Sequence, residues 1–451
     1  MDVLFVSEYF PPKIMGGGEI NLFSIAAALS KKGIGVTVLT SFHAGLKKEE
    51  EMENIHVCRR LKTGTSPQGI LNNLKRSAAF PRSVGKEVTK ITKEQKIDLI
   101  HFIGTSIIAA ERLKGLGIPL VATIESFPTV CPKGDRIYHG KEECKVVCSR
   151  SEFKRCQAHS DEIGKMKNKF YIKHNPLALR YIYTYYEKLN RSLHYCTLIA
   201  ISNYVQQLLK QQGVESTVIP NALDVKIFAS IQSTSTQNDV GNHDDSTKNS
   251  TDTENNTDRN KIDQNKKVRI LYLGSLTKYK GPQILLKAIE RMDMKDGMNV
   301  RCDLYGEGIL REELQQMINE NGLDAEIHPP VPYQEIPDLY AKADIVVFPS
   351  LWPEPFGRIA IEAMAAGKPV IGSRVGAIPE LIAEETGILV APGNSVELRQ
   401  AIQKLITNPA RREELGKNGR KVAENDYSAD SVITKVLLFY ENIAPDKKVA
   451  Q

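Results

Sequence analysis

The chain has 451 residues, which is too long for one ordinary hydrophobic core, so two domains are expected. Hydrophobic residues make up 41% and charged residues 25%, as in ordinary globular proteins. A net charge of +6 is mild over this length. It permits an anionic substrate or membrane surface but does not argue for a nucleic-acid partner.

The amino terminus shows no basic leader, and its first apolar run is short. No stretch approaches the ~20 apolar residues that a membrane helix needs. Seven cysteines, an odd number, in such a chain indicate a reducing compartment. We therefore expect a cytoplasmic protein, with peripheral contact at the inner face of the membrane left open.

The first half of the chain alternates short apolar runs with longer helical patterns. Strands are predicted at residues 2–6, 36–40, 98–102, 119–124 and 198–201, and helices at 19–31, 107–116 and 203–211, with a basic helical stretch between the second and third strands. Ser202 is placed to cap the last of these helices. Strands that alternate with helices predict a parallel, doubly wound α/β sheet.

A glycine turn, Gly16-Gly17-Gly18, joins the first predicted strand to its helix. A strand, a glycine turn and a helix in this order expose backbone amides to a phosphate. The spacing is not the GxGxxG of dinucleotide-binding folds, so that fingerprint fails. On spacing alone, a structural turn and a phosphate site are equally supported.

Four cysteines, Cys131, Cys144, Cys148 and Cys156, lie within one polar segment. Four thiols can hold a structural zinc ion, which takes four sulfur or nitrogen ligands. The segment has no CxxC pair and its spacings are irregular, so free thiols are favoured over zinc, and a disulfide comes last. We therefore expect no tightly bound zinc.

Two segments differ from the alternating pattern. Residues 165–195 mix basic and aromatic side chains, a face that could lie on an anionic membrane, although a helix packed on its own domain is favoured. Residues 230–267 are rich in Ser, Thr, Asn, Asp and Lys without apolar periodicity. They cannot bury enough surface to offset the entropy of ordering, which predicts a disordered insert.

A second alternation begins at residue 268. Strands are predicted at residues 268–273, around 303–305, within 327–332, around 345–348 and from residue 370, and helices at 395–407, 410–423 and 428–441. The first of these strands runs into a loop that contains Ser275 and Lys280, and the second ends at Gly306. This half therefore predicts a second sheet with glycine turns at strand ends.

The stretch from Trp352 to Leu381 reads WPEPFGRIAIEAMAAGKPVIGSRVGAIPEL. Pro353 and Pro355 hold its start extended. Gly357 then allows the backbone to approach a ligand closely. An apolar helical pattern follows, and Gly367 can cap it.

Two carboxylates flank the start of this helix: Glu354 precedes it and Glu362 lies on it. Amides near Phe356, Gly357 and Arg358 would face an anion, helped by the helix dipole. The carboxylates would repel a diphosphate and are better placed to accept hydrogen bonds from hydroxyls on either side of it. The stretch suits a ligand that is part phosphate and part sugar.

The full string resembles the signature of the retaining family-four (group-1) glycosyltransferases, nucleotide-sugar enzymes of the GT-B fold. The resemblance covers most of the chain except residues 225–267, the linker with its insert. It implies two doubly wound Rossmann-like domains that face a central cleft: an acceptor-side domain at 1–224 and a nucleotide-sugar domain at 268–427. A last helix within 428–451 would cross back to the first domain.

The resemblance also assigns roles to single residues. Glu354 would meet the donor sugar hydroxyls, Glu362 the ribose, Lys280 the diphosphate and the backbone near Val331 the base, while the glycine turn would close on the donor. The implied donor-binding residues are Gly16, Gly17, Gly18, Ser275, Lys280, Gly306, Val331, Glu354, Phe356, Gly357, Arg358 and Glu362. Catalysis is expected from Glu354, Lys280 and Glu125.

The chain departs from the family pattern at two of these positions. Ser275 stands where the family has an arginine, and Glu125 stands where it usually has a histidine in a threonine-x-histidine-aspartate context. His101 matches a different family position and is interpreted as structural.

The resemblance implies hexosyl transfer with retention, from a UDP- or GDP-sugar to a hydroxyl of a glycan, a lipid-linked or a small-molecule acceptor. No Asp-x-Asp pair occurs in the chain, so neither a metal-dependent diphosphate site nor a cofactor is expected. A nucleotide-sugar 2-epimerase of the same fold and a catalytically weakened nucleotide-sugar-binding protein remain alternatives. The Glu354–Glu362 string together with Lys280 favours transfer.

Overall fold

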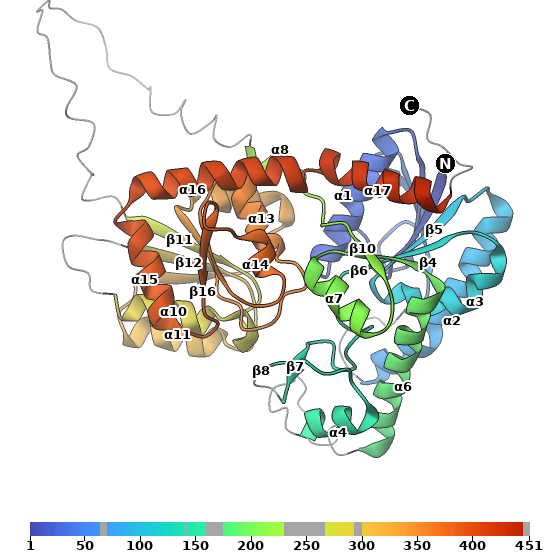
Figure 1. The fold of residues 1–451 in the computed structure, drawn as a ribbon, viewed down its shortest axis with the longest axis horizontal. Helices are drawn as coiled ribbons and strands as arrows, with labels where there is room; N and C mark the ends of the chain where they lie inside the picture. Colours follow the sequence, from blue (N-terminus) through green and yellow to red (C-terminus); the bar gives the residue numbers. More distant parts are fainter. Residues whose placement is uncertain (64–69, 140–141, 159–174, 230–266, 293–299, 445–451) are drawn as a thin grey trace, which may run out of the picture.

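The computed structural model describes residues 1–63, 70–139, 142–158, 175–229, 267–292 and 300–444. The insert predicted at 230–267 lies outside these residues except for its last position, and so does the first part of the basic and aromatic stretch. Two sheets organise the described chain (Figure 1).

The first sheet has eight strands in the order β10-β9-β6-β5-β1-β2-β4-β3, all parallel except β3. The strands are β1 (Asp2–Val6), β2 (Gly35–Ser41), β3 (Glu49–Met52), β4 (Ile55–Leu61), β5 (Leu99–Ile103), β6 (Leu120–Ile124), β9 (Thr197–Ala200) and β10 (Ser216–Val218). The α-helices of this half are α1 (Gly17–Lys31), α2 (Ile70–Glu94), α3 (Ala110–Leu113), α4 (Arg150–Ala158), α6 (Pro176–Ser192), α7 (Asn203–Gln211) and α8 (Lys226–Ala229). Ser202 caps α7 by accepting from the Val205 amide, as predicted.

Two features of this half differ from the sequence prediction. The helix expected at 107–116 is broken into a 3₁₀ turn (Gly104–Ala109), α3 and a second 3₁₀ turn (Lys114–Leu116), which ends at Gly117 with a φ of +69°. Strands β3 and β4 were not predicted, because acidic and basic residues hide their pattern. In β4 the buried Arg59 donates to the Pro11 carbonyl oxygen at 2.7 Å, so its charge does not keep it at the surface.

The second sheet has six parallel strands in the order β13-β12-β11-β14-β15-β16. They are β11 (Val268–Leu273), β12 (Val300–Tyr305), β13 (Ala325–His328), β14 (Ile345–Phe348), β15 (Val370–Ser373) and β16 (Gly387–Val390). Their helices are α10 (Pro282–Glu290), α11 (Arg311–Glu320), α12 (Ile336–Lys342), α13 (Arg358–Ala365), α14 (Ile378–Leu381), α15 (Ser395–Ile406) and α16 (Pro409–Val422). The strand expected within 327–332 stops at His328, because Pro329 and Pro330 have no amide hydrogen to continue the ladder.

Helix α17 (Ala429–Ile443) follows α16 along the upper edge of Figure 1 and lies beside α1 of the first half. Its apolar residues, among them Val432, Val436 and Tyr440, complete the core on one face of the first sheet. His101 on β5 is buried below it. The His101 Nδ1 lies 2.5 Å from the Tyr440 hydroxyl and its Nε2 lies 2.7 Å from the Thr123 hydroxyl. The end of the chain is therefore part of the first domain's packing.

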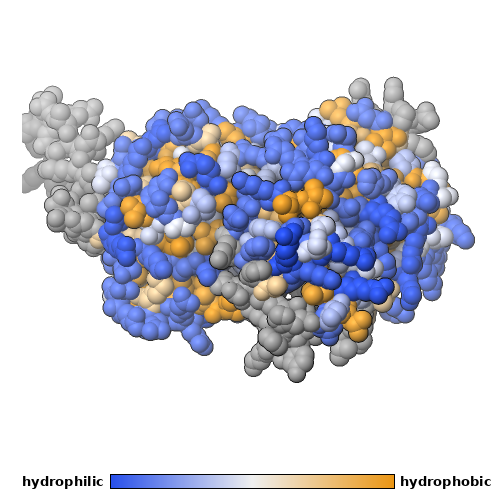
Figure 2. All heavy atoms as spheres, turned by 60° about the horizontal axis from the view of Figure 1, so that its bottom comes forward, coloured by the Kyte–Doolittle hydropathy of each residue, from blue (hydrophilic) through white to orange (hydrophobic). Residues whose placement is uncertain are grey.

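No helix among the described residues is long and apolar enough to cross a membrane. Figure 2 turns the lower edge of Figure 1 forward and shows hydrophilic side chains over most of that face, with hydrophobic ones in scattered places. The described part of the basic and aromatic stretch forms α6, whose Leu179, Tyr183 and Tyr186 pack with Phe153 of α4. This helix packs on its own domain.

Candidate active site

Glycine-bearing loops meet at the carboxyl edge of the second sheet, after β11, β12 and β14. Gly306 has a φ of +155°, and a Cβ at this position would overlap the Gly274 carbonyl oxygen. The Leu276 amide donates to the Glu307 carbonyl oxygen at 2.9 Å, which ties two of these loops together. Only glycine permits such close backbone packing, so the loops form one continuous rim.

Glu354 and Lys280 meet on this rim. The buried Glu354 carboxylate accepts from the Lys280 Nζ at 2.5 Å and from the Ser350 hydroxyl at 2.9 Å. The Lys280 ammonium also stands 4.4 Å from the centre of the Trp352 ring, a cation–π contact. An anion that binds here would compete with Glu354 for the lysine. Ser350 and Trp352 were not identified as site residues from the sequence.

The backbone around Glu354 is held in place by the loop that precedes α14. The Ala377 amide donates to the Glu354 carbonyl oxygen at 2.9 Å. Gly376 has a φ of +54°, and a Cβ there would clash with the backbone of Pro353 and Glu354. The loop before α14 therefore holds the orientation of the carboxylate.

Glu362 lies buried on α13 and is already well supplied with donors. Its carboxylate accepts from the Arg358 Nε at 2.8 Å and from the hydroxyls of Tyr333 and Tyr340 at 3.2 and 3.1 Å. Burial raises the pKa of Glu362, while Arg358 and the two hydroxyls oppose this rise. The Arg358 Nη2 also donates to the Tyr333 hydroxyl at 2.8 Å, which closes the cluster.

The glycine turn of the first domain lies between residues of both domains. Glu125, just after β6, accepts from the Asn21 Nδ2 at 2.9 Å, and burial raises its pKa to about 7 against that hydrogen bond. A Cβ at Gly18 would overlap the Glu125 Oε2. A Cβ at Gly17 would stand 3.3 Å from the Arg358 Cδ.

Gly16 differs from its two neighbours. It precedes α1 in an extended conformation with a φ of −174°, and a Cβ there would have nothing within 4 Å. Its amide donates to the Glu19 Oε2 at 2.9 Å, and the Met15 amide donates to the same oxygen at 3.3 Å. Two amides that could face a phosphate are thus engaged by Glu19 in this structure.

A hydrogen-bonded path joins the carboxylates of the two domains. Asn21 links Glu125 to Ala222, because its Oδ1 accepts from the Ala222 amide at 2.8 Å. The Ala222 carbonyl oxygen in turn accepts from the Arg358 Nη1 at 3.2 Å, and Arg358 holds Glu362. Buried Asn21 and the Ala222 backbone therefore link Glu125 of the first domain to the Arg358–Glu362 pair of the second. No spacing in the sequence indicates this link.

The remaining residues that were expected to contact the donor differ in exposure and in backbone conformation. Ser275 is exposed, Val331 is half-buried, and Gly357 is the residue before α13 with a φ of +116°. The Phe356 ring is buried and packs edge-on against Tyr427, with 6.0 Å between the ring centres. Only the backbone of Phe356 is therefore placed to face a ligand.

One carboxylate and histidine group in the described part of the chain has ligand-type atoms within 4.8 Å of one another: Asp303, Glu326 and His328. Arg301 forms ion pairs with both acids, and the His328 Nε2 lies 3.0 Å from the Asp303 Oδ1. These charges already compensate one another, and an ion would have to displace the guanidinium. We assign no metal to this group.

Two facing α/β units, a glycine-lined rim on the second sheet and a last helix that returns to the first unit define the GT-B class of glycosyltransferase fold. Residues 15–227 match the family model described as Glycosyltransferase Family 4, and residues 252–422 match Glycosyl transferases group 1. The chain belongs to the group 1 glycosyltransferases.

Solved structures with this fold superpose over almost the whole chain. Sucrose-phosphate synthase from Thermosynechococcus elongatus has a TM-score of 0.71 at 19% identity and covers 99% of this chain and 100% of its own. Anabaena HepE in complex with UDP-glucose has a TM-score of 0.63 at 19% identity and covers 98% and 100%. At these identities the similarity establishes the fold.

Curated relatives are similar over a shorter stretch. The D-inositol 3-phosphate glycosyltransferase of Arthrobacter sp. is 32% identical over 157 residues, 34% of this chain and 37% of that protein. Spore coat protein SA of Bacillus subtilis is 32% identical over 181 residues, 38% of this chain and 48% of that protein. The matched region is thus less than half the length of these relatives.

Proposed function

We propose that the protein transfers a hexosyl group, with retention, from a nucleotide sugar to a hydroxyl acceptor. The observation that carries this proposal is the junction of Lys280, Glu354 and Trp352 on the rim of the second sheet, next to the Arg358–Glu362 pair. It joins a cation for a diphosphate to carboxylates for sugar hydroxyls. The UDP-glucose complex of HepE, a protein of this fold, supports a UDP-sugar as donor.

In the proposed reaction, the bond between the sugar's anomeric carbon and the diphosphate oxygen breaks, and a bond from that carbon to the acceptor oxygen forms. The acceptor's hydroxyl proton passes to the departing diphosphate, which leaves with the electron pair of the broken bond. Lys280 and the amides at the start of α13 stabilise the negative charge that gathers on the diphosphate. Because Glu354 holds Lys280 in this structure, donor binding draws the lysine from the carboxylate to the phosphate.

The carboxylates then act on hydroxyls. Glu354, freed from part of its ion pair, orients the sugar, and Glu362 with its tyrosines binds the ribose. Glu125 joins the site from the first domain through Asn21, the Ala222 backbone and Arg358. With a pKa raised by burial to about 7, its carboxyl group exists in both protonation states near neutral pH and can donate to or accept from a sugar hydroxyl.

The acceptor would enter from the first domain. The name of the Arthrobacter relative indicates a small phosphorylated polyol, and glycan or lipid-linked hydroxyls fit the same chemistry. A cytoplasmic location completes the proposal, with peripheral contact at the inner face of the membrane left open.

Kinetics with a UDP-sugar test this assignment. Lys280→Ala should lower kcat by roughly 10²–10³-fold, by analogy with the loss of an oxyanion donor. Glu362→Gln should mainly raise the donor KM, by roughly tenfold or more. Lys278→Ala, in the same turn, is the matched loss of charge and should leave kcat within about twofold of wild type.

Product analysis and UDP titration by calorimetry complete the test. Glu354→Gln should lower kcat while leaving UDP affinity nearly intact. If Lys280→Ala retains the wild-type kcat, the leaving-group assignment is wrong. An isomerised donor without transfer would establish the 2-epimerase instead, and UDP binding without turnover of any donor would establish a binding protein.

A further inference from the structure

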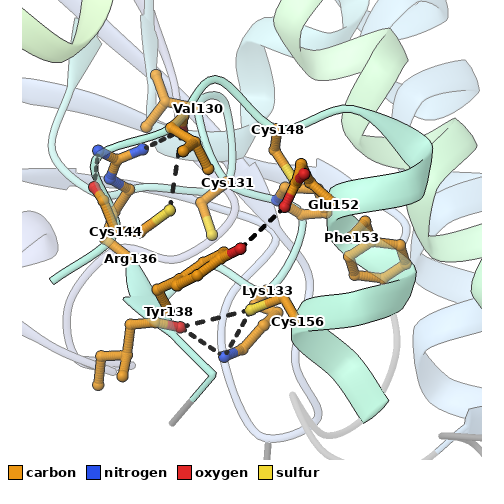
Figure 3. Close-up of a pocket in the computed structure, with 13 residues that line it drawn as sticks. Val130, Cys131, Lys133, Arg136, Tyr138, Cys144, Cys148, Glu152, Phe153 and Cys156 are labelled. Atoms are coloured by element: carbon orange, nitrogen blue, oxygen red, sulfur yellow. Dashed lines mark hydrogen bonds between the residues drawn. The ribbon is translucent and has the colours of Figure 1, made fainter. Parts of the chain in front are cut away.

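The four clustered cysteines line one small cavity (Figure 3). Cys131 comes from the loop after β6, Cys144 and Cys148 follow the hairpin of β7 (Ile137–Tyr138) and β8 (Glu142–Glu143), and Cys156 lies on α4. The cavity measures about 10 Å³, which is room for one small ion or one water. Cys131, Cys144 and Cys156 are buried and Cys148 is half-buried, so the fold gathers four thiols that the sequence spaces irregularly.

A cation lies beside one of these sulfurs. The Lys133 Nζ lies 3.6 Å from the Cys156 Sγ and donates to the Ile137 carbonyl oxygen at 2.8 Å. An ammonium donor beside sulfur stabilises the thiolate form, which is the form that binds metal.

Two cations and one carboxylate, Arg136, Lys133 and Glu152, line the cavity. The Arg136 guanidinium is buried and donates to the carbonyl oxygens of Cys144 and Val146, while its Nε lies buried with no hydrogen-bond partner among the described residues. The Lys133 side chain is only 3% exposed and is paired with Asp135 at 3.3 Å. Four thiolates around a divalent ion bear two net negative charges, and the Arg136 guanidinium would offset part of them.

We propose that Cys131, Cys144, Cys148 and Cys156 form a four-thiolate site for one zinc ion. Among the described residues, no three of the four sulfurs lie within 4.8 Å of one another, whereas sulfurs around zinc lie ~4 Å apart. Zinc would draw the side chains inward around the cavity they already line. This inference differs from the expectation of free thiols, which rested on spacing along the chain and on a reducing compartment.

A zinc ion with four protein ligands has a structural role, since no position remains for a substrate. The segment it would hold has two strands of two residues each and contacts the second domain through Trp352. The Trp352 Nε1 donates to the Asp135 carbonyl oxygen at 2.5 Å, and the Phe127 ring meets the Trp352 ring edge-on at 5.7 Å. Through Trp352, the site would support Lys280, a step that rests on the proposed function.

The decisive measurement is the metal content of the full chain, purified without added zinc. We expect one zinc per chain in the wild type and none in the Cys144→Ser/Cys148→Ser variant. Cys196→Ser is the control, because Cys196 is half-buried and does not line the cavity. This readout requires no donor and no turnover, so it is independent of whether hexosyl transfer is the activity.

Because the double variant can fail to fold, the wild type is also tested directly. Zinc should be released by titration of its thiols with an organomercurial, and protein produced with cobalt should show the intense visible absorption of tetrahedral sulfur-bound cobalt(II). Substoichiometric zinc together with no such cobalt spectrum would overturn the proposal and return the four cysteines to free thiols. Equal zinc in wild type and a folded double variant would also overturn it.

Discussion

The three glycines of the turn after β1 differ in what surrounds them, and this separates their roles. Gly18→Ala should push the Glu125 carboxylate away from Asn21, because the new Cβ would occupy the space of Oε2. We expect kcat/KM for transfer to fall roughly tenfold to a hundredfold, the usual effect of a misplaced catalytic group. Steady-state kinetics with a UDP-sugar would measure it.

Gly115→Ala is the matched control for this change, because Gly115 lies in the short helical turn before β6 and a Cβ there would meet nothing within 4 Å. The variant should stay within about twofold of wild type. Equal losses in both variants would mean that the loss in Gly18→Ala does not come from its contact with Glu125.

At the level of single residues, the sequence predicts some members of the candidate active site and misses others. Glu354 and Glu362 stand in a recognisable string and Lys280 in the loop after a predicted strand, and the structure places Lys280 and Glu354 in direct contact. Tyr333 and Asn21 contribute through contacts with residues 29 and 104 positions away, Glu362 and Glu125. Such partners depend on tertiary packing, for which a single sequence gives no periodicity or spacing.

At the level of single elements, the packing of α17 on the first sheet involves a buried histidine, His101, which contacts Tyr440. Burial lowers the pKa of His101 to about 3, whereas the unfolded chain titrates near 6.5. Between these values the unfolded state binds the proton and the folded state does not, so the free energy of unfolding falls as pH decreases below 6.5. At about pH 5 the loss should be about 2 kcal/mol from this residue alone.

Urea unfolding at several pH values would measure this dependence. His101→Gln keeps hydrogen-bonding capacity but cannot titrate, so its unfolding free energy should vary less between about pH 7 and pH 5 than that of wild type. Identical slopes in the two proteins would contradict the assignment of His101.

The elements also show where pattern reading fails. Largely apolar runs such as β1, β11 and β14 were found because most of their residues favour burial in a parallel sheet. Strand β4 was missed because Arg59 is buried and satisfied by the Pro11 carbonyl oxygen and by Glu50 at 2.5 Å. A side chain that usually marks the surface was compensated by partners on neighbouring segments, of which Pro11 lies 48 positions away.

At the level of the whole molecule, one carboxylate of the second domain accepts hydrogen bonds from the first domain. Glu380 of α14 accepts from the amides of Asn203 and Tyr204 at 2.7 and 2.6 Å, at the amino terminus of α7. Glu380→Ala should free these amides and weaken the contact by about 0.5–2 kcal/mol, as for the loss of a helix cap. We expect a larger radius of gyration in small-angle scattering and faster hydrogen exchange at Asn203 and Tyr204.

Glu384→Ala removes the same charge from an exposed position nearby. There the backbone carbonyl oxygen, and not the carboxylate, accepts from Arg411, so the variant should behave as wild type. If Glu380→Ala shows no change in either measurement, the two domains are held by their other contacts, such as the hydrogen bond from the Ser202 hydroxyl to the Pro355 carbonyl oxygen at 2.7 Å.

The return of α17 to the first sheet separates the order of synthesis from the order of folding. On the ribosome, Leu22 and Val36 of the first domain are made early, yet the residues that cover them, Val432 and Val436 among them, emerge after the entire second domain. A nascent chain therefore holds an uncovered apolar surface throughout most of its translation, which makes it a target for chaperones and for aggregation. The first domain is begun first and completed last.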